Sequence, residues 1–399
     1  MGRHDQTMDH GDGFNTRAVH AGEIMDERFG NVVTPVFETA TFMSPNRSAD
    51  PYMDTSRGEP FLYTRWGNPT TQSLESKYAS LDSVKYGIAF SSGMAAISSA
   101  VFGLCSRGDR ILSINELYGQ THSFFSSYLQ RFGIGCDFIT LDQANSLSFN
   151  LRGHALLYLE SIINPTLKVA DLERIGNFCR ENGIPLLVDA TFASPYNQNP
   201  SAFGASVVLH SGTKYISGHS DVTLGLAGMN NRDTFDRIHA VRRTTGPVPD
   251  PLQSYLAARG MKTIGLRVER QNRVAMDLAG FLSQHRKVVR VHYPGLKESP
   301  YHEIARKVLR GYGGMVSFEV AGGLSGARKF MASLKVPAVA ASLGGVESLV
   351  TLPVETSHSS IPPDERKAMG IEDGLVRFSC GIEDSQDLID DIDSALSLL

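Results

Sequence analysis

The sequence predicts an α/β protein in which a mainly parallel, seven-stranded sheet forms a large domain and a smaller α/β domain follows at the C-terminal end. Between residues 85 and 228, short apolar runs rich in β-branched residues alternate with stretches of helical pattern. Strands that are apolar along their whole length and separated by helices are typical of a parallel sheet with both faces covered. The chain has 399 residues, which is too many for one compact core, so a second domain is expected.

The expected elements follow this alternation along the chain. The strands are Tyr86–Phe90, Arg110–Ile114, Asp137–Leu141, Ala155–Leu159, Pro185–Asp189, Ser206–Leu209 and Thr223–Gly228, and the helices between them include Met94–Leu104, Gln120–Phe132 and Ala170–Asn182. A long amphipathic helix, Leu266–His285, then leads to strand-like runs at Met315–Val320 and Leu375–Ser379. We therefore divide the chain into an N-terminal tail and arm (1–64), a large domain (65–260) and a small domain (261–399). The irregular arm is expected to pack on a neighbouring subunit.

Composition excludes several classes of protein. The formal net charge is −4 and no run of Lys or Arg stands out, which argues against a nucleic-acid partner. The apolar stretches are too short and too interrupted for a membrane span. Residues 1–13 are polar and lack the apolar core of a signal peptide, so we expect a loose tail. The four cysteines have neither zinc-ligand nor CxxC spacing, which predicts reduced thiols, no metal site and a cytoplasmic location.

A lysine that could act as a nucleophile follows the strand that ends at Leu209. The segment Ser211–Lys214 reads Ser-Gly-Thr-Lys, and ligands of parallel α/β sheets bind beyond the carboxyl ends of the strands. A neutral lysine amine can attack an aldehyde, and burial or a nearby cation favours the neutral form. The two hydroxyl residues beside it, Ser211 and Thr213, are suited to holding a phosphate.

Two further elements belong with Lys214. The preceding strand ends in Asp189, a carboxylate that can pair with a protonated pyridine nitrogen. Between the first strand and its helix lies Ser91–Met94, where free backbone N–H groups and the helix dipole favour an anion and Gly93 permits close approach. Together these elements supply a phosphate cradle, a ring-nitrogen partner and a Schiff-base lysine, as pyridoxal 5'-phosphate (PLP) requires. Neither the P-loop nor the Rossmann glycine fingerprint occurs.

The same segments, with several others, carry a resemblance to a known family. The matching stretches are Tyr63–Thr70, Ser92–Ile97, Leu117–Gly119, Val188–Phe192, Val208–Tyr215, Ser342–Leu349 and Arg377–Ser379. In these motifs the sequence resembles the Cys/Met-metabolism PLP enzymes, from about Thr16 to Leu399. That family includes cystathionine γ-synthase, cystathionine γ-lyase, methionine γ-lyase and the O-acylhomoserine sulfhydrylases. The resemblance implies the fold-type I PLP-dependent transferase fold, which is aspartate-aminotransferase-like.

The resemblance also implies a role for each matching position. Lys214 holds the cofactor and moves protons, Tyr118 stacks on the cofactor ring and acts as an acid, and Arg377 binds the α-carboxylate of a small amino-acid substrate. Tyr63 and Arg65 reach the phosphate of a neighbouring subunit, which implies a homodimer or homotetramer. The other implied cofactor contacts are Ser92, Gly93, Met94, Asp189, Thr191, Ser211 and Thr213, and the other implied substrate contacts are Asn164 and Ser342.

Three positions bear on the far end of the substrate. Family members that act on cystathionine or succinylated homoserine resemble one another in charged residues at positions that are Trp66, Ser123 and Ala341 here. A distal charge without a partner in a closed site costs several kcal/mol in order of magnitude. We therefore expect γ-elimination from methionine or another uncharged thioether. Gln120 argues against a methionine lyase, because the methionine lyases of the family resemble one another in having a cysteine at this position.

Other reactions remain open on the sequence alone. A γ-replacement enzyme, such as cystathionine γ-synthase or an O-acylhomoserine sulfhydrylase, needs the same cofactor and the same first proton transfers. Cystathionine γ-lyase differs from a methionine lyase only in its substrate. A more distant alternative is a PLP-fold protein that binds a partner without catalysis, against which stand the intact Lys214, Asp189, Tyr118 and Arg377.

Overall fold

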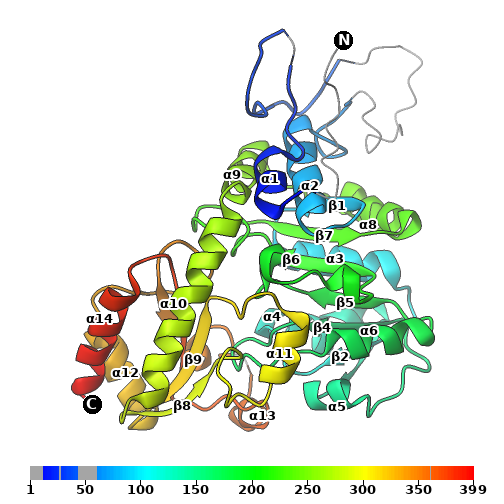
Figure 1. The fold of residues 1–399 in the computed structure, drawn as a ribbon. Helices are drawn as coiled ribbons and strands as arrows, with labels where there is room; N and C mark the ends of the chain where they lie inside the picture. The colour runs from blue at the N-terminus through cyan, green and yellow to red at the C-terminus, as the bar shows by residue number, and fades with distance from the viewer. Residues whose placement is uncertain (1–11, 27, 44–60, 360) are drawn as a thin grey trace.

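The computed structural model describes residues 12–26, 28–43, 61–359 and 361–399. Most of the expected N-terminal tail, residues 1–11, lies outside the described residues. Two sheets organise the rest of the chain, and the long helix α10 (Ile264–Gln284) runs from beside the larger sheet to the smaller one (Figure 1). No helix in the described ranges combines the length and apolar character needed to cross a membrane.

The larger sheet has seven strands in the order β1-β7-β6-β5-β4-β2-β3. They are β1 (Tyr86–Phe90), β2 (Arg110–Ile114), β3 (Gly135–Ile139), β4 (Leu156–Glu160), β5 (Leu186–Asp189), β6 (Val207–Ser211) and β7 (Gly225–Met229). Only β7 runs antiparallel to its neighbours, β1 and β6. The predicted mainly parallel, seven-stranded sheet is confirmed, and each strand lies within two residues of its expected bounds.

Both bounds of β3 lie two residues before the expected Asp137–Leu141. Gly135 already pairs with Arg110 of β2, so the strand begins earlier. It ends before Thr140, whose hydroxyl accepts the N–H of Gln143 while the Gln143 side chain accepts the Thr140 N–H. This capping box starts α5 (Leu141–Ser146) and removes Leu141 from the strand.

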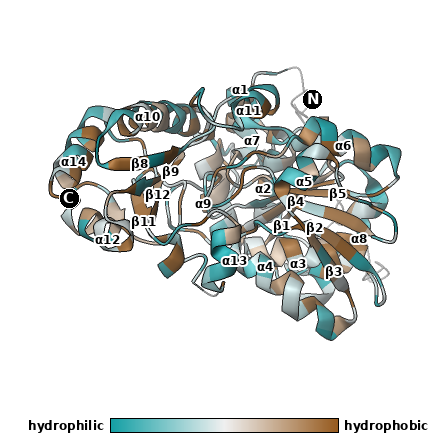
Figure 2. Cartoon of the chain, turned by 90° about the horizontal axis from the view of Figure 1, so that it is seen from below, coloured by the Kyte–Doolittle hydropathy of each residue, from teal (hydrophilic) through white to brown (hydrophobic). Residues whose placement is uncertain are grey.

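Helices cover both faces of the larger sheet, as its apolar strands require. Figure 2 shows α3 (Gly93–Leu104) and α8 (Arg232–Thr245) on one side and α5 and α6 (Leu172–Glu181) on the other. The expected single helix at 120–132 consists of α4 (Gly119–Ser123), a π-helical turn at Phe124–Tyr128 and a 3₁₀ turn at Leu129–Phe132. The wider turn buries both Phe124 and Phe125, and the Phe125 ring packs edge-on against Tyr158 at 4.8 Å.

The smaller sheet has five strands in the order β10-β11-β12-β9-β8. They are β8 (Val288–His292), β9 (Met315–Val320), β10 (Ala338–Val339), β11 (Leu349–Thr351) and β12 (Leu375–Ser379), and their apolar side chains pack against α10, α12 (Gly323–Ser333) and α14 (Ser385–Ser397). Two shorter helices of the C-terminal part of the chain are α11 (His302–Val308) and α13 (Pro363–Ala368). The expected strands at Met315–Val320 and Leu375–Ser379 have the predicted bounds.

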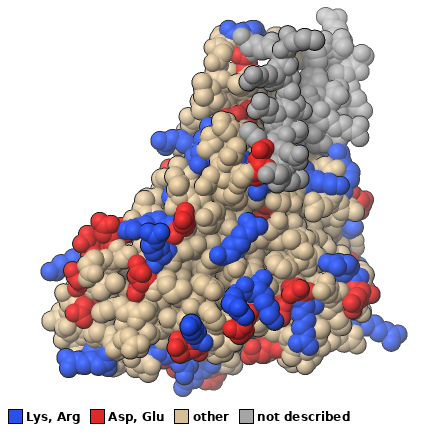
Figure 3. All heavy atoms as spheres, in the orientation of Figure 1, with Lys and Arg blue, Asp and Glu red and all other residues tan. Residues whose placement is uncertain are grey.

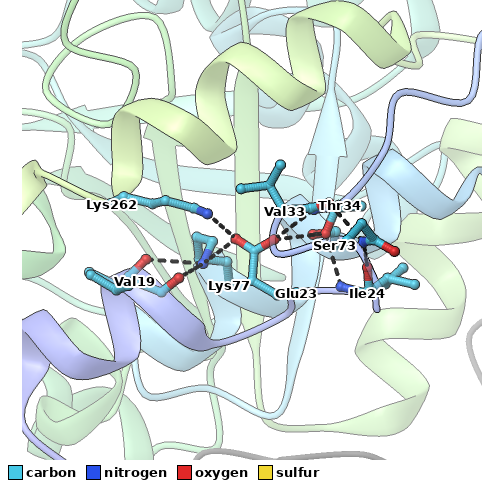
Figure 4. A network of polar contacts seen from close by, with 10 residues as sticks. Val19, Glu23, Ile24, Val33, Thr34, Ser73, Lys77 and Lys262 are labelled. Carbon is cyan, nitrogen blue, oxygen red and sulfur yellow. Dashed lines mark hydrogen bonds and ion pairs between the residues drawn. The ribbon is translucent and has the colours of Figure 1, made fainter. Parts of the chain in front are cut away.

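The beginning of the arm is attached to its own chain. Helix α1 (Phe14–His20) packs on α2 (Pro69–Leu81) and α10. The fully buried Lys77 Nζ of α2 donates to the Ala18 and Val19 carbonyls at 3.0 and 3.2 Å (Figure 4). Glu23 lies 3.4 Å from Lys77 Nζ and 2.7 Å from Lys262 Nζ, at the junction of α9 (Pro251–Met261) and α10. Burial lowers the Lys77 pKa to about 8, and the Glu23 carboxylate opposes that shift.

The face drawn in Figure 3 carries charged residues of both signs. Lys and Arg side chains are interspersed there with Asp and Glu over both halves of the molecule.

One glycine of β7 determines how closely the sheet approaches the start of α3. Gly225 pairs with Phe90 of β1 and Ser211 of β6, and a Cβ atom added to it would overlap the Ser92 carbonyl. The short turn before α3 therefore lies directly against the β7 backbone, which only glycine permits.

We predict that Gly225→Ala destabilises the protein by about 1–3 kcal/mol, because the added methyl group must displace backbone. Differential scanning calorimetry should show a lower Tm. Gly280→Ala is the matched control, since nothing lies within 4 Å of a Cβ atom at that position of α10. It should leave the Tm unchanged or raise it, as alanine favours a helix interior by up to about 1 kcal/mol. Equal Tm values for the two variants would contradict the close approach.

Candidate active site

A cavity of about 650 Å³ lies where the carboxyl ends of the large sheet's parallel strands face the smaller sheet. It brings together every candidate residue from the sequence except Tyr63 and Arg65. Its lining includes Ser92, Gly93, Met94, Tyr118, Asn164, Asp189, Thr191, Ser211, Thr213, Lys214, Ser342 and Arg377. Residues more than 280 positions apart in the chain thus share one space, because parallel strands end at the same edge of a sheet.

Lys214 follows β6 and reaches across to the C-terminal half. Its Nζ donates to Ser342 Oγ at 2.9 Å. Burial, and then the positive charge of Arg377, lower the Lys214 pKa to about 8. A much larger fraction of this amine is therefore neutral near pH 7 than for an ordinary lysine, and the neutral form is the one that attacks an aldehyde.

Asp189 ends β5 and is held by the turn that follows it. Its Oδ1 accepts the Thr191 N–H at 2.9 Å, and Thr191 Oγ1 accepts the Ser211 N–H at 2.8 Å. Thr191 therefore ties the ends of β5 and β6 together. Burial raises the Asp189 pKa, so a cation in the cavity would stabilise the ionised carboxylate, and a protonated pyridine nitrogen is such a cation.

The start of α3 forms an anion cradle. Ser92 caps the helix, with its Oγ accepting the Ala95 N–H at 3.1 Å, which leaves the Gly93 and Met94 N–H groups in the first turn. A Cβ atom on Gly93 would lie 3.0 Å from the Ser211 Cβ, so glycine keeps this corner of the cavity open. Helix dipole, first-turn N–H groups and the Ser211 hydroxyl fit a phosphate.

Arg377 is the cation that the smaller sheet contributes. It lies on β12 and is buried, with Nη1 donating to Asn164 Oδ1 at 3.0 Å and Nη2 to the Ser342 carbonyl at 3.0 Å. Burial lowers its pKa to about 10, which leaves it charged near neutral pH. Ser342 has a φ of +88°, a left-handed conformation that is costly for a residue with a side chain and is found most often at functional sites.

Tyr118 precedes α4, with its ring partly exposed in the cavity. Its N–H donates to Glu160 Oε1 at 2.6 Å. Sequence reasoning missed Glu160, the buried last residue of β4, although it is paired in register with Asp189. It also missed Thr356 and Ser357, which line the cavity from the loop after β11 and belong to no chemical motif.

Tyr63 and Arg65 lie outside this cavity in their own chain. Arg65 Nη1 donates to the Arg243 carbonyl at 2.5 Å, and its guanidinium lies over the Tyr63 ring at 5.4 Å. The Tyr63 ring is 40% exposed. The chain does not bring this pair to its own lysine, so the expected contact with a neighbouring subunit stays a prediction.

The three positions expected to meet the far end of the substrate, Trp66, Ser123 and Ala341, do not lie together in one cavity. Ala341 lines the main cavity beside Ser342. Trp66 lines a smaller cavity of about 120 Å³ between the arm, α2 and α8. Ser123 lies in α4 and is not part of either lining. Only Ala341 thus bears directly on what this chain's own cavity can bind.

The residues present fit PLP as a bound group. An anion cradle, a buried carboxyl with a raised pKa and a lysine with a lowered pKa meet in one cavity, which matches the phosphate, ring nitrogen and aldehyde of the cofactor. The volume of about 650 Å³ is within the range of small-molecule sites.

Comparison with known proteins agrees with this fit. The chain is 39% identical over 385 residues to cystathionine gamma-lyase of Dictyostelium discoideum, covering 96% of this chain and 97% of that protein. It is also 39% identical over 391 residues to L-methionine gamma-lyase of Fusobacterium nucleatum subsp. polymorphum, covering 96% and 98%. The crystal structure of metB from Corynebacterium glutamicum superposes with a TM-score of 0.91 at 36% identity, covering 98% of this chain and 99% of that chain.

A sequence profile of the family settles the assignment. The profile described as Cys/Met metabolism PLP-dependent enzyme matches residues 15–397, which span both sheets and every residue of the cavity. The fold-type I architecture expected from the sequence is shared with these relatives. The chain therefore belongs to the Cys/Met-metabolism family of PLP-dependent enzymes.

Proposed function

We propose that this enzyme is a carbon–sulfur lyase that eliminates the γ-substituent of an uncharged thioether amino acid, with methionine as the representative substrate. The observation that supports it most is the set of charged groups in the cavity. Among the described residues these are Glu160, Asp189, Lys214 and Arg377. Asp189, Lys214 and Arg377 have tasks at the cofactor or the substrate carboxylate, both oxygens of Glu160 accept backbone N–H groups, and Ala341 offers only a methyl group. A distal ammonium or carboxylate would remain unpaired, at a cost of several kcal/mol in order of magnitude.

Three side chains carry out the steps of the reaction. Bound PLP supplies an electron sink that allows protons to leave the substrate's Cα and Cβ. Arg377 holds the substrate α-carboxylate with its forked guanidinium. Lys214 Nζ takes the protons, and its lowered pKa suits it to do so near neutral pH. Tyr118 covers the ring, and its hydroxyl donates a proton to the departing sulfur.

The remaining candidates hold the cofactor in place. Gly93 and Met94 offer backbone N–H groups to the phosphate, with the hydroxyls of Ser92, Ser211 and Thr213 around it. Asp189 pairs with the ring nitrogen, and Thr191 fixes the Asp189 carboxyl. Asn164 and Ser342 orient Arg377, to which Asn164 Oδ1 and the Ser342 carbonyl both bond at 3.0 Å.

Cystathionine γ-elimination is the second candidate. The chain is as similar to a cystathionine gamma-lyase as to an L-methionine gamma-lyase, at 39% identity to each. A γ-replacement reaction shares the same first steps and differs in the thiol that attacks afterwards. An assay that offers methionine, cystathionine, cysteine and O-acetylhomoserine with sulfide separates these reactions, by scoring 2-oxobutanoate against new thioether.

We infer that two chains complete each site. Tyr63 and Arg65 lie outside their own cavity, and Arg65 can supply a cation to a neighbour's phosphate, so the working unit is a homodimer or a homotetramer built from it. We also propose the division into arm (1–64), large domain (65–260) and small domain (261–399), whose second boundary lies close to the end of α9 at Met261 and the start of α10 at Ile264.

We also infer a reducing compartment, the cytoplasm. Cys105, Cys136, Cys179 and Cys380 are all unpaired, and burial raises the thiol pKa of Cys105 and Cys179 to about 12, which makes these two thiols unreactive. Cell fractionation of the tagged protein checks this location.

Lys214→Ala should lose the covalent bond to the cofactor together with turnover. We expect kcat to fall by at least about 10²–10⁴-fold, because the residue that moves the protons is missing. The visible absorption of the holoenzyme and the release of 2-oxobutanoate from methionine measure the two effects. Lys329→Ala on α12 is the control and should change neither. Turnover near that of the unmodified enzyme in Lys214→Ala would refute the assignment.

Mixed dimers test the shared site. Lys214→Ala and Arg65→Ala chains should each be weakly active alone, whereas dimers with one chain of each kind should regain activity. In such a dimer one site combines an intact Lys214 with an intact Arg65 from the other chain. Co-expression with two affinity tags isolates these dimers for assay. Mixed dimers no more active than the single variants, or a fully active monomer in analytical ultracentrifugation, would rule out the shared site.

Ala341→Glu should shift the preference towards cystathionine. A carboxylate at this position can pair with a distal ammonium, and we expect the kcat/KM ratio of cystathionine to methionine to rise about tenfold, or about 1.4 kcal/mol. Ala341→Gln is the matched control of the same size without charge, and it should leave the ratio nearly unchanged. If the unmodified enzyme already prefers cystathionine, the argument from cavity charge is wrong.

A further inference from the structure

Glu160 is a buried carboxyl in the cavity wall to which none of the cofactor chemistry has been assigned. We propose that it is a positioning residue, which holds the Tyr118 loop and the Asn164 loop in fixed relation to each other at the end of β4. The inference rests on the proposed function, since it explains how the ring-covering tyrosine and the carboxylate-binding arginine are placed for that reaction.

The two oxygens of Glu160 bond to two different loops. Oε1 accepts the Tyr118 N–H at 2.6 Å, and Oε2 accepts the Asn164 N–H at 3.4 Å. The first is short, as expected for a carboxylate acceptor, and the second is a weaker contact. Tyr118 precedes α4 and Asn164 follows β4, so one side chain connects segments more than 40 residues apart in the chain.

Both loops lead directly to groups that act on the substrate. The Asn164 Oδ1 accepts from Arg377 Nη1 at 3.0 Å. A line of hydrogen bonds therefore runs from the Tyr118 backbone through Glu160 and Asn164 to the Arg377 guanidinium. A shift of Glu160 changes the separation between the tyrosine ring and the arginine, which together define where the substrate lies.

The surroundings of Glu160 suit a support better than a reacting group. Its side chain is 6% exposed, and it is paired in register with Asp189 on β5. Burial, and then the neighbouring Asp189 carboxyl, raise the Glu160 pKa. The two Glu160 oxygens give the Tyr118 and Asn164 N–H groups acceptors that they would otherwise lack in a buried place.

Two substitutions and a matched pair test the proposal on the PLP-loaded enzyme. Glu160→Ala removes both acceptors, and Glu160→Gln keeps an acceptor for Tyr118 while turning a donor towards Asn164. Asp391→Ala and Asp391→Asn are the matched controls, because Asp391 Oδ2 also accepts two backbone N–H groups, from Lys335 and Val336 at 2.9 Å each, away from the cavity. Amide hydrogen exchange followed by mass spectrometry and steady-state kinetics with methionine are measured on all four variants.

We expect Glu160→Ala to exchange faster in the peptides around 115–123 and 162–168 and to lose about 10²-fold in kcat, the size of effect that a misplacement of about 1 Å produces. KM should change much less. Glu160→Gln should restore protection around 115–123 and most of kcat, with faster exchange only around 162–168. The Asp391 variants should exchange faster around 333–338 and keep their kcat.

Unchanged exchange in both segments, or kcat of Glu160→Ala equal to that of Asp391→Ala, would overturn the proposal. If Glu160→Ala does not fold, Glu160→Gln decides alone: no change in exchange around 162–168 overturns the proposal. Failure of the proposed function looks different, because the unmodified enzyme would then release no 2-oxobutanoate while the exchange pattern still tests Glu160.

Discussion

The site depends on one constraint, which is that parallel strands place their carboxyl ends at the same edge of the sheet. β4, β5 and β6 end at Glu160, Asp189 and Ser211, and these ends form one wall of the cavity. Backbone groups and charges gathered at such an edge must find partners there, because burial without a partner is costly. Thr191 supplies partners between β5 and β6, and Glu160 supplies them to the loops on either side of β4.

A second consequence of burial is the way charge is distributed across the cavity. The Glu160 and Asp189 carboxyls end strands of the large sheet, Lys214 follows β6 of the same sheet, and Arg377 lies on β12 of the smaller sheet. Burial raises the pKa of the acids and lowers the pKa of the bases. Every one of these groups is therefore easier to neutralise than in water, which prepares the site to exchange protons with a bound molecule near neutral pH.

The sequence predicts the sheet well because its signal is local. Apolar, β-branched runs mark the strands, and Lys214, Asp189 and Ser92 were placed at strand ends from the pattern alone. Strand β3 ends at Ile139, two residues earlier than expected, because a capping box at Thr140 and Gln143 starts the next helix there. The apolar pattern alone does not show this end. The π-helical turn at Phe124–Tyr128 was not predicted, since it depends on packing of Phe125 against Tyr158 on another strand. The sequence does not indicate three residues of the cavity wall for a similar reason. Only the three-dimensional fold brings Glu160, Thr356 and Ser357 to the cavity.

The hydrogen bond between Lys214 Nζ and Ser342 Oγ ties the reacting amine to the other half of the molecule. Ser342 belongs to the segment between β10 and β11, which is bonded to the smaller sheet through Gly344 N–H and Ser379 Oγ and to the segment after Lys214 through Val346 N–H and the Gly218 carbonyl. Mild heat or low denaturant that loosens the smaller sheet would release the amine and Arg377 together, while the larger sheet stays intact. Inactivation would then precede the loss of most secondary structure, so the half-life of activity and the melting of the fold would report on two different parts of this chain.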